Sequence, residues 1–257
     1  MTNQTSFFVT LKNRGLVTVT GPDAAAFLQN LVTNDIALLE KQPSLYTCLL
    51  NAQGKFLHDF FITKNGDSYL LDCEGGERAQ DLHKRLSMYK LRAQVELACQ
   101  PENTVYAVFL AQHGWPDPRH SDLGWRSFEK PQGLEEKPFE EWDRLRLSLC
   151  IPDGSRDLIV NHSTMDEARM DRLNAVDYNK GCYVGQELTA RMHYRGLGKK
   201  HLYTIQTSGA FPAFNTDLRA GDILIGDMRS SCGNIGLALL KDEFVDQIEK
   251  AGLKLLT

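Results

Sequence analysis

The sequence lacks several patterns that mark specialised classes of protein. No apolar run approaches the roughly 18 residues of a membrane span, because charged residues interrupt each one. Basic residues do not predominate, since 29 basic and 33 acidic residues give a net charge of −4 and hence no overall positive field to attract nucleic acid. Neither a Gly-x-Gly-x-x-Gly nor a Walker pattern occurs, so nucleotide binding has no support from the sequence.

Cysteine is present but is not arranged to hold a metal. The six cysteines are far apart without a Cys-x-x-Cys pair, and the seven histidines form no His-x-x-x-His pair. We therefore predict no metal site, neither a zinc ribbon nor a permanently bound iron–sulfur cluster. Unpaired cysteines are typical of a reducing compartment, and residues 1–11 lack the basic start and apolar stretch of a secretory signal. We expect a bacterial cytoplasmic location in preference to the mitochondrial matrix, with no cleaved leader and no membrane contact.

The composition is that of a globular protein, with 42% hydrophobic and 24% charged residues in a chain of 257. Alternating apolar residues predict strands, and apolar residues spaced three or four apart predict helices. In the first 112 residues the predicted strands cover 6–11, 16–20, 45–51, 55–63, 68–72, 93–99 and 104–110, with helices after residue 22 and over 77–90. This order indicates an α+β region with a mainly antiparallel sheet.

The remainder of the chain divides into three parts. Residues 113–138 are rich in proline and glycine and predict an irregular connector with at most one short strand, near residues 125–128. Residues 139–200 begin with a helical pattern and form a second region. Short apolar runs after residue 201, separated by glycine-bearing turns, are typical of a small β-barrel. We therefore predict a first α+β region (1–112), a connector (113–138), a second α+β region (139–200) and a C-terminal barrel (201–257).

The segment 179–191 carries the clearest indication of chemistry. Cys182 is flanked by glycines, the second of which is Gly185, and the residues after Gly185 have helical character. A helix N-terminus and the nearby Lys180 and Arg191 favour the thiolate, which is the nucleophilic and metal-ligating form of cysteine. We therefore predict a functional thiol at Cys182, assisted by Lys180. The alternative, a partly exposed thiol in a turn, stays open at this point.

A local cationic strip follows the candidate thiol. No acid occurs from Leu188 to Thr216, whereas Arg191, Arg195, Lys199 and Lys200 fall within this stretch. Such a strip is suited to a phosphate, a polyanionic ligand tail or RNA. The alternative is a solvated face whose charge is balanced by acids elsewhere in the fold.

The run Lys180–Glu187, with the sequence KGCYVGQE, resembles the signature of the YgfZ-type folate-binding proteins. These are relatives of the glycine-cleavage T-protein and include a mitochondrial iron–sulfur assembly factor. Weaker matches fall in the expected order along nearly the whole chain: 21–29, 33–36, 53–55 with Asp59, 144–146, 151–154, Glu167 and 233–236. One departure is that Met165 stands where the family usually has proline, and Asp166 adds a second carboxylate beside Glu167.

The resemblance implies a fold, a ligand and a set of site residues. The fold is a T-protein-like ring of two interwoven α+β domains closed by a small C-terminal β-barrel. The ligand is tetrahydrofolate or a one-carbon-substituted derivative, with Glu167 holding the pterin and Asp59 near the reactive one-carbon end. Cys182 is the required cysteine. Further cofactor-binding roles are implied for five residues: Asn34, Tyr183, Gln186, Glu187 and Arg191.

Three functions remain in consideration from the sequence. The favoured one is a folate-binding accessory protein for iron–sulfur cluster assembly or repair, including that of cluster-dependent tRNA-modifying enzymes, with Cys182 ligating iron or forming a mixed disulfide. The second is an aminomethyltransferase-like transfer of a one-carbon unit to tetrahydrofolate, so that enzymatic turnover is left open. The third is a non-enzymatic adaptor that contacts tRNA or a partner through the Arg191–Lys200 strip. We expect folate and iron–sulfur client or assembly proteins as partners, and a monomer.

Overall fold

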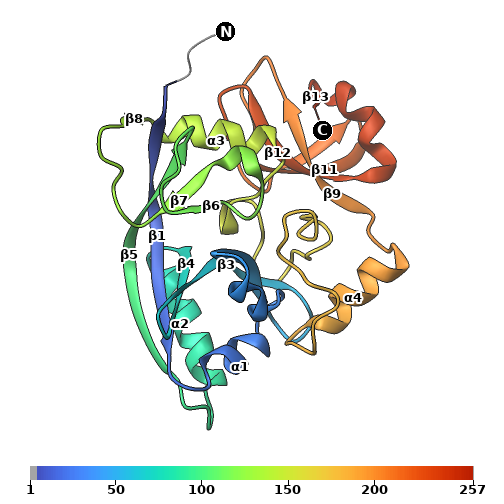
Figure 1. The fold of residues 1–257 in the computed structure, drawn as a ribbon. Helices are drawn as coiled ribbons and strands as arrows, with labels where there is room; N and C mark the ends of the chain where they lie inside the picture. The colour runs from blue at the N-terminus through green and yellow to red at the C-terminus, as the bar shows by residue number, and fades with distance from the viewer. Residues whose placement is uncertain (1–4, 257) are drawn as a thin grey trace.

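Two β-sheets organise the chain in a computed structural model that describes residues 5–256 (Figure 1). The expectation about a leader concerns residues that are in part outside this range. The first sheet has the strand order β2-β3-β4-β1-β5-β7-β6, with β8 paired in parallel to the start of β1. Its strands are β1 (Phe7–Thr20), β2 (Ser44–Leu50), β3 (Phe56–Asn65), β4 (Ser68–Glu74), β5 (Glu96–Phe109), β6 (Trp115–Pro116), β7 (Trp125–Ser127) and β8 (Glu135–Lys137).

The second sheet lies in the C-terminal part of the chain and has the order β10-β11-β12-β9-β13. Its strands are β9 (Lys200–Gln206), β10 (Asp217–Ala220), β11 (Ile223–Cys232), β12 (Ile235–Lys241) and β13 (Lys254–Leu255). The helices of the whole chain are α1 (Ala24–Gln29), η1 (Ile36–Glu40), α2 (Glu77–Tyr89), η2 (Ser121–Leu123), α3 (Phe139–Ser148), η3 (Gly154–Arg156), α4 (Gln186–Arg195) and η4 (Asp242–Ala251). No helix in residues 5–256 combines the length and the apolar character needed to cross a membrane.

The turn chemistry of the sequence accounts for the β3–β4 hairpin. Asn65 pairs with Ser68 across the turn, and Gly66 takes a positive φ of 59°, which glycine adopts at little cost. The first strand differs from the prediction, because 6–11 and 16–20 form the single strand β1. Register shifts between Leu11 and Leu16 give the strand an irregularity without ending it. The apparent break in alternation is therefore a bulge.

The strands β2 and β3 are buried on both faces and separate two hydrophobic cores. Leu45 and Leu49 pack into the core on the side of α1 and α2, whereas Tyr46 and Cys48 pack into the other core. This is the period-two alternation of a strand with both faces covered. The second core is completed by the irregular segment 157–185, which contributes residues such as Met170.

The middle of the chain is more closely integrated with the first sheet than its composition indicates. The 113–138 segment contributes β6, β7 and β8, where one short strand was expected, because pairing with β5 and β1 orders short stretches that have little strand character of their own. The 139–200 segment contributes α3, η3 and α4, and its only strand residue within the described chain is Lys200, the first of β9. These two segments bridge the first sheet and the C-terminal sheet (Figure 1).

Candidate functional site

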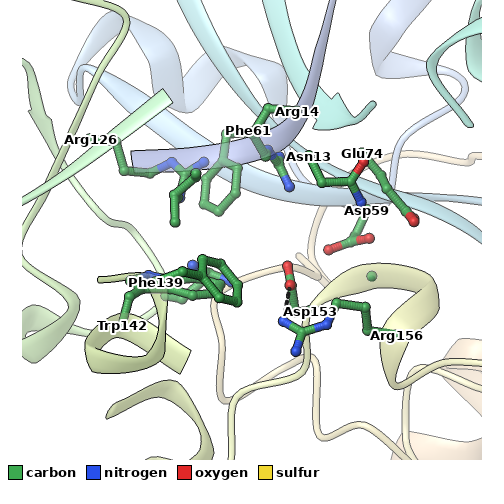
Figure 2. Close-up of a pocket in the computed structure, with 13 residues that line it drawn as sticks. Asn13, Arg14, Asp59, Phe61, Glu74, Arg126, Phe139, Trp142, Asp153 and Arg156 are labelled. Atoms are coloured by element: carbon green, nitrogen blue, oxygen red, sulfur yellow. Dashed lines mark hydrogen bonds and ion pairs between the residues drawn. The ribbon is translucent and has the colours of Figure 1, made fainter. Parts of the chain in front are cut away.

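A cavity of about 270 Å³ lies between the first sheet and the segment that carries α3 and η3. Asp59 and Phe61 of β3 project from the sheet, and Phe139 and Asp153 lie across the gap from them (Figure 2). Ligand-binding cavities span roughly 300–1,000 Å³, so this one has room for a ring system and not for a large ligand as a whole. The cavity is a candidate for a small-molecule site, because charged and aromatic side chains line it together.

Two carboxyl groups in this cavity are in opposite electrostatic environments. Asp59 is 8% exposed and accepts a hydrogen bond of 2.6 Å from the Tyr46 hydroxyl. Burial raises the pKa of Asp59, although this hydrogen bond acts in the other direction. Burial also acts to raise the pKa of Asp153, but the positive charges of Arg146 and Arg156 outweigh it and lower that pKa to about 2. The site therefore pairs a carboxyl group that is more easily protonated with one that stays ionised.

Arginine side chains surround the aromatic ring of Phe61. The guanidinium carbon of Arg126 is 3.8 Å from the ring centroid, and that of Arg119 is 4.8 Å away. The buried Asp72 fixes Arg126 by an ion pair, and the buried Asp117 fixes Arg119 at 2.8 Å. These cations are held by pairing and stacking before any ligand binds, which reduces the entropy lost on binding.

Two further features of the cavity suit a bound ligand. The Nε of Arg126 and the Nε1 of Trp142 are buried and have no hydrogen-bond partner in the described chain, a deficit that a ligand or a water can relieve. Gly154 has a φ of +52°, and a Cβ there would come within 3.1 Å of Asp59 Oδ1 and 3.2 Å of Glu74 Oε2. Glycine at this position keeps the space next to two carboxylates open.

Cys182 lies outside this cavity, on the loop that precedes α4. It is the only exposed one of the six cysteines, all of which are within residues 5–256. The following Gly185 has a φ of +83° and packs against the β2–β3 loop, where a Cβ would come within 2.5 Å of the Asn51 carbonyl and 3.0 Å of Gly54. The KGCYVGQE signature therefore contacts the loop that contains Gln53-Gly54-Lys55, although the two motifs are far apart in the sequence. This contact fixes the loop that carries Cys182.

Lys180 fixes the same loop from its other side. Its side chain is buried, and its ammonium donates hydrogen bonds of 2.8, 2.6 and 2.8 Å to the carbonyls of Gln29, Val32 and Asn34. Burial lowers the pKa of Lys180 to about 8, so that the ammonium remains mostly protonated at neutral pH. Because all three of its N–H groups are engaged, these contacts support a positioning role for Lys180. Its predicted catalytic role stays a prediction.

The other predicted site residues are distributed over several places. Tyr183 is buried in the second core, and burial raises its pKa to about 12. Gln186, Glu187 and Arg191 belong to α4, with Glu187 and Arg191 exposed. The side-chain amide of Asn34 donates to the carbonyls of Tyr46 and Asn174. Tyr183, Gln186, Glu187 and Arg191 follow Cys182 in the sequence, and none of them lines the cavity around Asp59.

Glu167 does not line the cavity either. Its carboxylate accepts a hydrogen bond of 2.9 Å from the backbone N–H of Thr164, and its own N–H donates to the Thr164 hydroxyl. This reciprocal pair is a capping box, which closes a turn. The role of Glu167 as pterin anchor stays a prediction, and the carboxylates that do line the cavity are those of Asp59, Glu74 and Asp153.

Most of the cavity residues were not predicted as site residues. Arg14 comes from β1, Glu74 from β4 and Arg156 from η3, and no spacing in the sequence connects them. The one available indication was the 151–154 match, which contains Asp153. Within the described residues no group of three or more His, Cys, Asp or Glu side chains is placed to hold a metal ion.

Comparisons with known proteins give the family of this chain. Residues 6–109 match the family model of the GCVT N-terminal domain, and residues 199–255 match that of the CAF17 C-terminal β-barrel domain. The chain is similar to the crystal structure of the glycine cleavage system aminomethyltransferase T from Bartonella henselae, with a TM-score of 0.69 and 16% identity over 95% of this chain and 80% of that one. This confirms the predicted T-protein-like fold with a C-terminal β domain.

The relatives also correct one expectation. The mitochondrial iron–sulfur cluster assembly factor IBA57 of mouse is 33% identical over 91% of this chain and 77% of its own length. The human protein is 32% identical over the same shares, and the mitochondrial homologue from Pyricularia oryzae is 32% identical over 96% and 75%. The expectation of a bacterial cytoplasmic location is therefore wrong. Cysteine usage indicates only a reducing compartment, which the mitochondrial matrix provides as well. At this identity and coverage, the chain belongs to the family of the iron–sulfur cluster assembly factor IBA57.

Proposed function

We propose that this protein is an accessory factor in the assembly or repair of iron–sulfur proteins and that Cys182 is its working thiol. The observation that carries the proposal is that Cys182 alone among the six cysteines is exposed, on a loop fixed from both sides. Exposed and positioned thiols are the ones that ligate metals or exchange disulfides. The names of the relatives support both this role and a mitochondrial location for it.

Residues 5–256, the part that the structure describes, do not provide the remaining ligands of a cluster. No other His, Cys, Asp or Glu side chains of residues 5–256 group with Cys182 into a metal site. A cluster that Cys182 ligates would therefore take its other ligands from a second protein or from small thiols, because iron–sulfur clusters are normally held by several thiolates. Such a thiol is suited to a transient contact with cargo.

Tetrahydrofolate, or a one-carbon derivative of it, is the ligand we propose for the cavity around Asp59. The amino and ring N–H groups of a pterin are donors, and the ionised Asp153 is an acceptor suited to them. Phe139 offers aromatic surface, and Arg14 offers positive charge for a carboxylate. Folate binding would be a property shared with the YgfZ-type folate-binding proteins, and we include membership of that branch of the superfamily in the proposal.

Complementation tests the role of the thiol. Cells that lack the endogenous factor would receive the wild-type chain, Cys182→Ser, or the control Cys232→Ser, in which a half-buried cysteine is changed. We expect Cys182→Ser to melt like the wild type and to fail to restore iron–sulfur enzyme activity, while Cys232→Ser restores it. Full complementation by Cys182→Ser would contradict the proposal.

Anaerobic calorimetric titration with tetrahydrofolate tests the ligand. Micromolar binding corresponds to about −8 kcal/mol, and we expect Asp153→Asn, which removes the charged acceptor proposed for the pterin N–H groups, to weaken it tenfold or more. Glu167→Ala, measured alongside, separates the two candidate anchors, because Glu167 does not line the cavity. Unchanged affinity in Asp153→Asn would remove this cavity as the folate site.

A second candidate function is one-carbon transfer to tetrahydrofolate. The observation that favours it is the buried Asp59, whose raised pKa suits a group that holds or donates a proton near a reacting nitrogen. Formation of methylenetetrahydrofolate from an aminomethylated lipoyl carrier protein would support this function. Absence of product in an assay in which a T-protein is active would exclude it.

A further inference from the structure

The turn between α2 and β5 presents apolar side chains to solvent at one end of the molecule. In Figure 1 this turn lies at the end away from the C-terminal sheet. Ten large hydrophobic residues of the described chain are exposed, and three of them fall within four consecutive positions: Met88, Tyr89 and Leu91. Leu91 is 88% exposed, the largest fraction among the ten, and Met88 is 60% exposed. Exposed apolar residues that cluster in this way commonly mark an interaction site.

The backbone at Leu91 is unusual for a leucine. Its φ is +43°, in the left-handed region that glycine and asparagine adopt readily and that is unfavourable for a leucine. The turn closes through the N–H of Ala93, which donates a hydrogen bond of 2.8 Å to the carbonyl of Lys90. Because the leucine side chain is exposed, it gains no packing energy that would offset this backbone strain. A strained residue that does not stabilise the fold points to a role outside the chain.

Positive charge accompanies these exposed apolar residues. No acid occurs from residue 82 to residue 95, and four basic residues fall within this stretch: Lys84, Arg85, Lys90 and Arg92. Arg85 is held by Asp81 at 2.6 Å, whereas the other three form no ion pair within residues 5–256. Two exposed acids, Asp23 and Glu96, lie at the strand end of the turn, so the positive charge is concentrated on the helix side. We call residues 84–92 the α2 tip.

The shape and the chemistry of the α2 tip favour a lipid surface over a protein or an RNA. A standard protein interface covers about 800 Å² on each partner, whereas the tip is one helix end and a turn from which a leucine projects. A bilayer surface accepts a projecting apolar side chain without a matching pocket, while neighbouring cations stay at the level of the lipid phosphates. Tyr89 has the amphipathic ring that is typical of this interface. An RNA would engage the cations and leave Met88 and Leu91 in water.

We propose that the α2 tip binds the surface of a membrane that contains anionic phospholipids. Met88 and Leu91 enter the interfacial layer, and Lys84, Lys90 and Arg92 contact the lipid phosphates. Apolar burial and electrostatic attraction then act together, as stable peripheral binding requires. The expectation of no membrane contact depends on the absence of a spanning run, and a peripheral contact needs no such run. The proposal is independent of the roles proposed for the thiol and for folate.

Flotation of the full chain with lipid vesicles tests the proposal. One set of vesicles is phosphatidylcholine with about 30% phosphatidylglycerol, and the other is phosphatidylcholine alone. At low salt we expect the wild type to partition onto the anionic vesicles about a hundredfold more strongly than onto the neutral ones, because three cations face the surface. At about 0.5 M salt this difference should largely disappear, because charges are then screened within a few ångströms.

Leu91→Asn separates the membrane contact from the stability of the fold. Asparagine adopts a positive φ more readily than leucine, so this variant should unfold at the same urea concentration as the wild type or at a higher one. Its partition onto anionic vesicles should fall about tenfold, because the leucine side chain no longer leaves water. The control is Leu110→Asn. Leu110 has a φ of +60° and is 59% exposed, but it follows the other end of β5, so its replacement should leave the partition unchanged.

The cations of the tip have a matched test of their own. Lys84→Gln with Arg92→Gln removes two charges and should lower the partition onto anionic vesicles at low salt about thirtyfold. Lys250→Gln with Lys254→Gln removes two exposed charges from η4 and β13, at the C-terminal sheet, and should have a much smaller effect.

Three results would overturn the membrane contact. One is failure of the wild type to float with anionic vesicles at low salt, and another is equal partition of Leu91→Asn and Leu110→Asn. The third is an absence of vesicle binding together with tRNA binding that is lost in Lys84→Gln/Arg92→Gln, which would assign the cations to RNA. None of these results bears on complementation by Cys182→Ser, so the proposed function is judged separately.

Discussion

Replacing Gly185 by alanine tests the contact that fixes the loop of Cys182. Gly185 and Gly196 flank α4, and both have positive φ values, of 83° and 57°. A Cβ on Gly185 would come within 2.5 Å of the Asn51 carbonyl and 2.9 Å of Leu50 Cβ, whereas a Cβ on Gly196 would meet nothing within 4 Å. Both substitutions place an alanine at a positive φ, which costs backbone energy. Only Gly185→Ala also brings the new Cβ into a steric clash.

The expected magnitudes follow from these two terms. The left-handed backbone costs an alanine about 1–2 kcal/mol, and overpacking a close contact costs a further 1–3 kcal/mol. We therefore expect Gly185→Ala to lower the free energy of unfolding by about 2–5 kcal/mol and Gly196→Ala by about 1–2 kcal/mol. Urea unfolding of the two variants beside the wild type measures the difference.

In Gly185→Ala the loop of Cys182 can detach locally without a loss of global stability. Amide hydrogen exchange detects such a local opening. The N–H of Val184 donates to the carbonyl of Asn30 at 3.2 Å, next to the contact of Gly185. If the loop detaches, exchange at Val184 accelerates in Gly185→Ala and not in Gly196→Ala. Equal destabilisation by the two substitutions, together with unchanged exchange at Val184, would refute the reasoning.

Three further substitutions or conditions have defined outcomes in urea unfolding. Lys180→Met removes three charged hydrogen bonds and should cost about 2–4 kcal/mol, with only partial recovery in Lys180→Arg, whose planar group does not present three converging donors. Arg146→Met leaves the buried Asp157, now 2.6 Å from the guanidinium, without its cation, and leaves Asp143 with Arg156 alone, at a cost of about 3–5 kcal/mol. Burial lowers the pKa of His58 from 6.5 to about 4, so the unfolded chain takes up a proton that the folded one does not, and stability should fall by about 2 kcal/mol between pH 6.5 and 5. In His58→Gln the loss of stability between pH 6.5 and 5 should be smaller by this amount. If His58→Gln and the wild type lose the same stability over this range, His58 is not the group responsible.

Local features of the sequence determined the elements that depend on neighbouring residues. Alternation predicted the core strands β2 and β3, and the Asn65-Gly66 pair predicted the turn between β3 and β4. The glycines around Cys182 predicted a thiol just before a helix, and the structure has the exposed Cys182 on the loop that precedes α4; the function of this thiol stays a prediction. These features depend on dihedral preferences and side-chain periodicity within a few residues, so they can be recognised without the tertiary fold.

The tertiary structure alone decided what surrounds the candidate sites. Arg14, Asp59 and Asp153 come together in one cavity because the first sheet and the α3–η3 segment share a face, and no spacing in the sequence encodes that meeting. Lys180 was predicted as an assistant to the thiol, but its ammonium is directed at three carbonyls about 150 positions earlier in the chain, such as that of Gln29 at a separation of 151. The lining of the cavity and the contacts of Lys180 both depend on burial and on pairing between distant residues. These are properties of the packed molecule and not of any one segment of the chain.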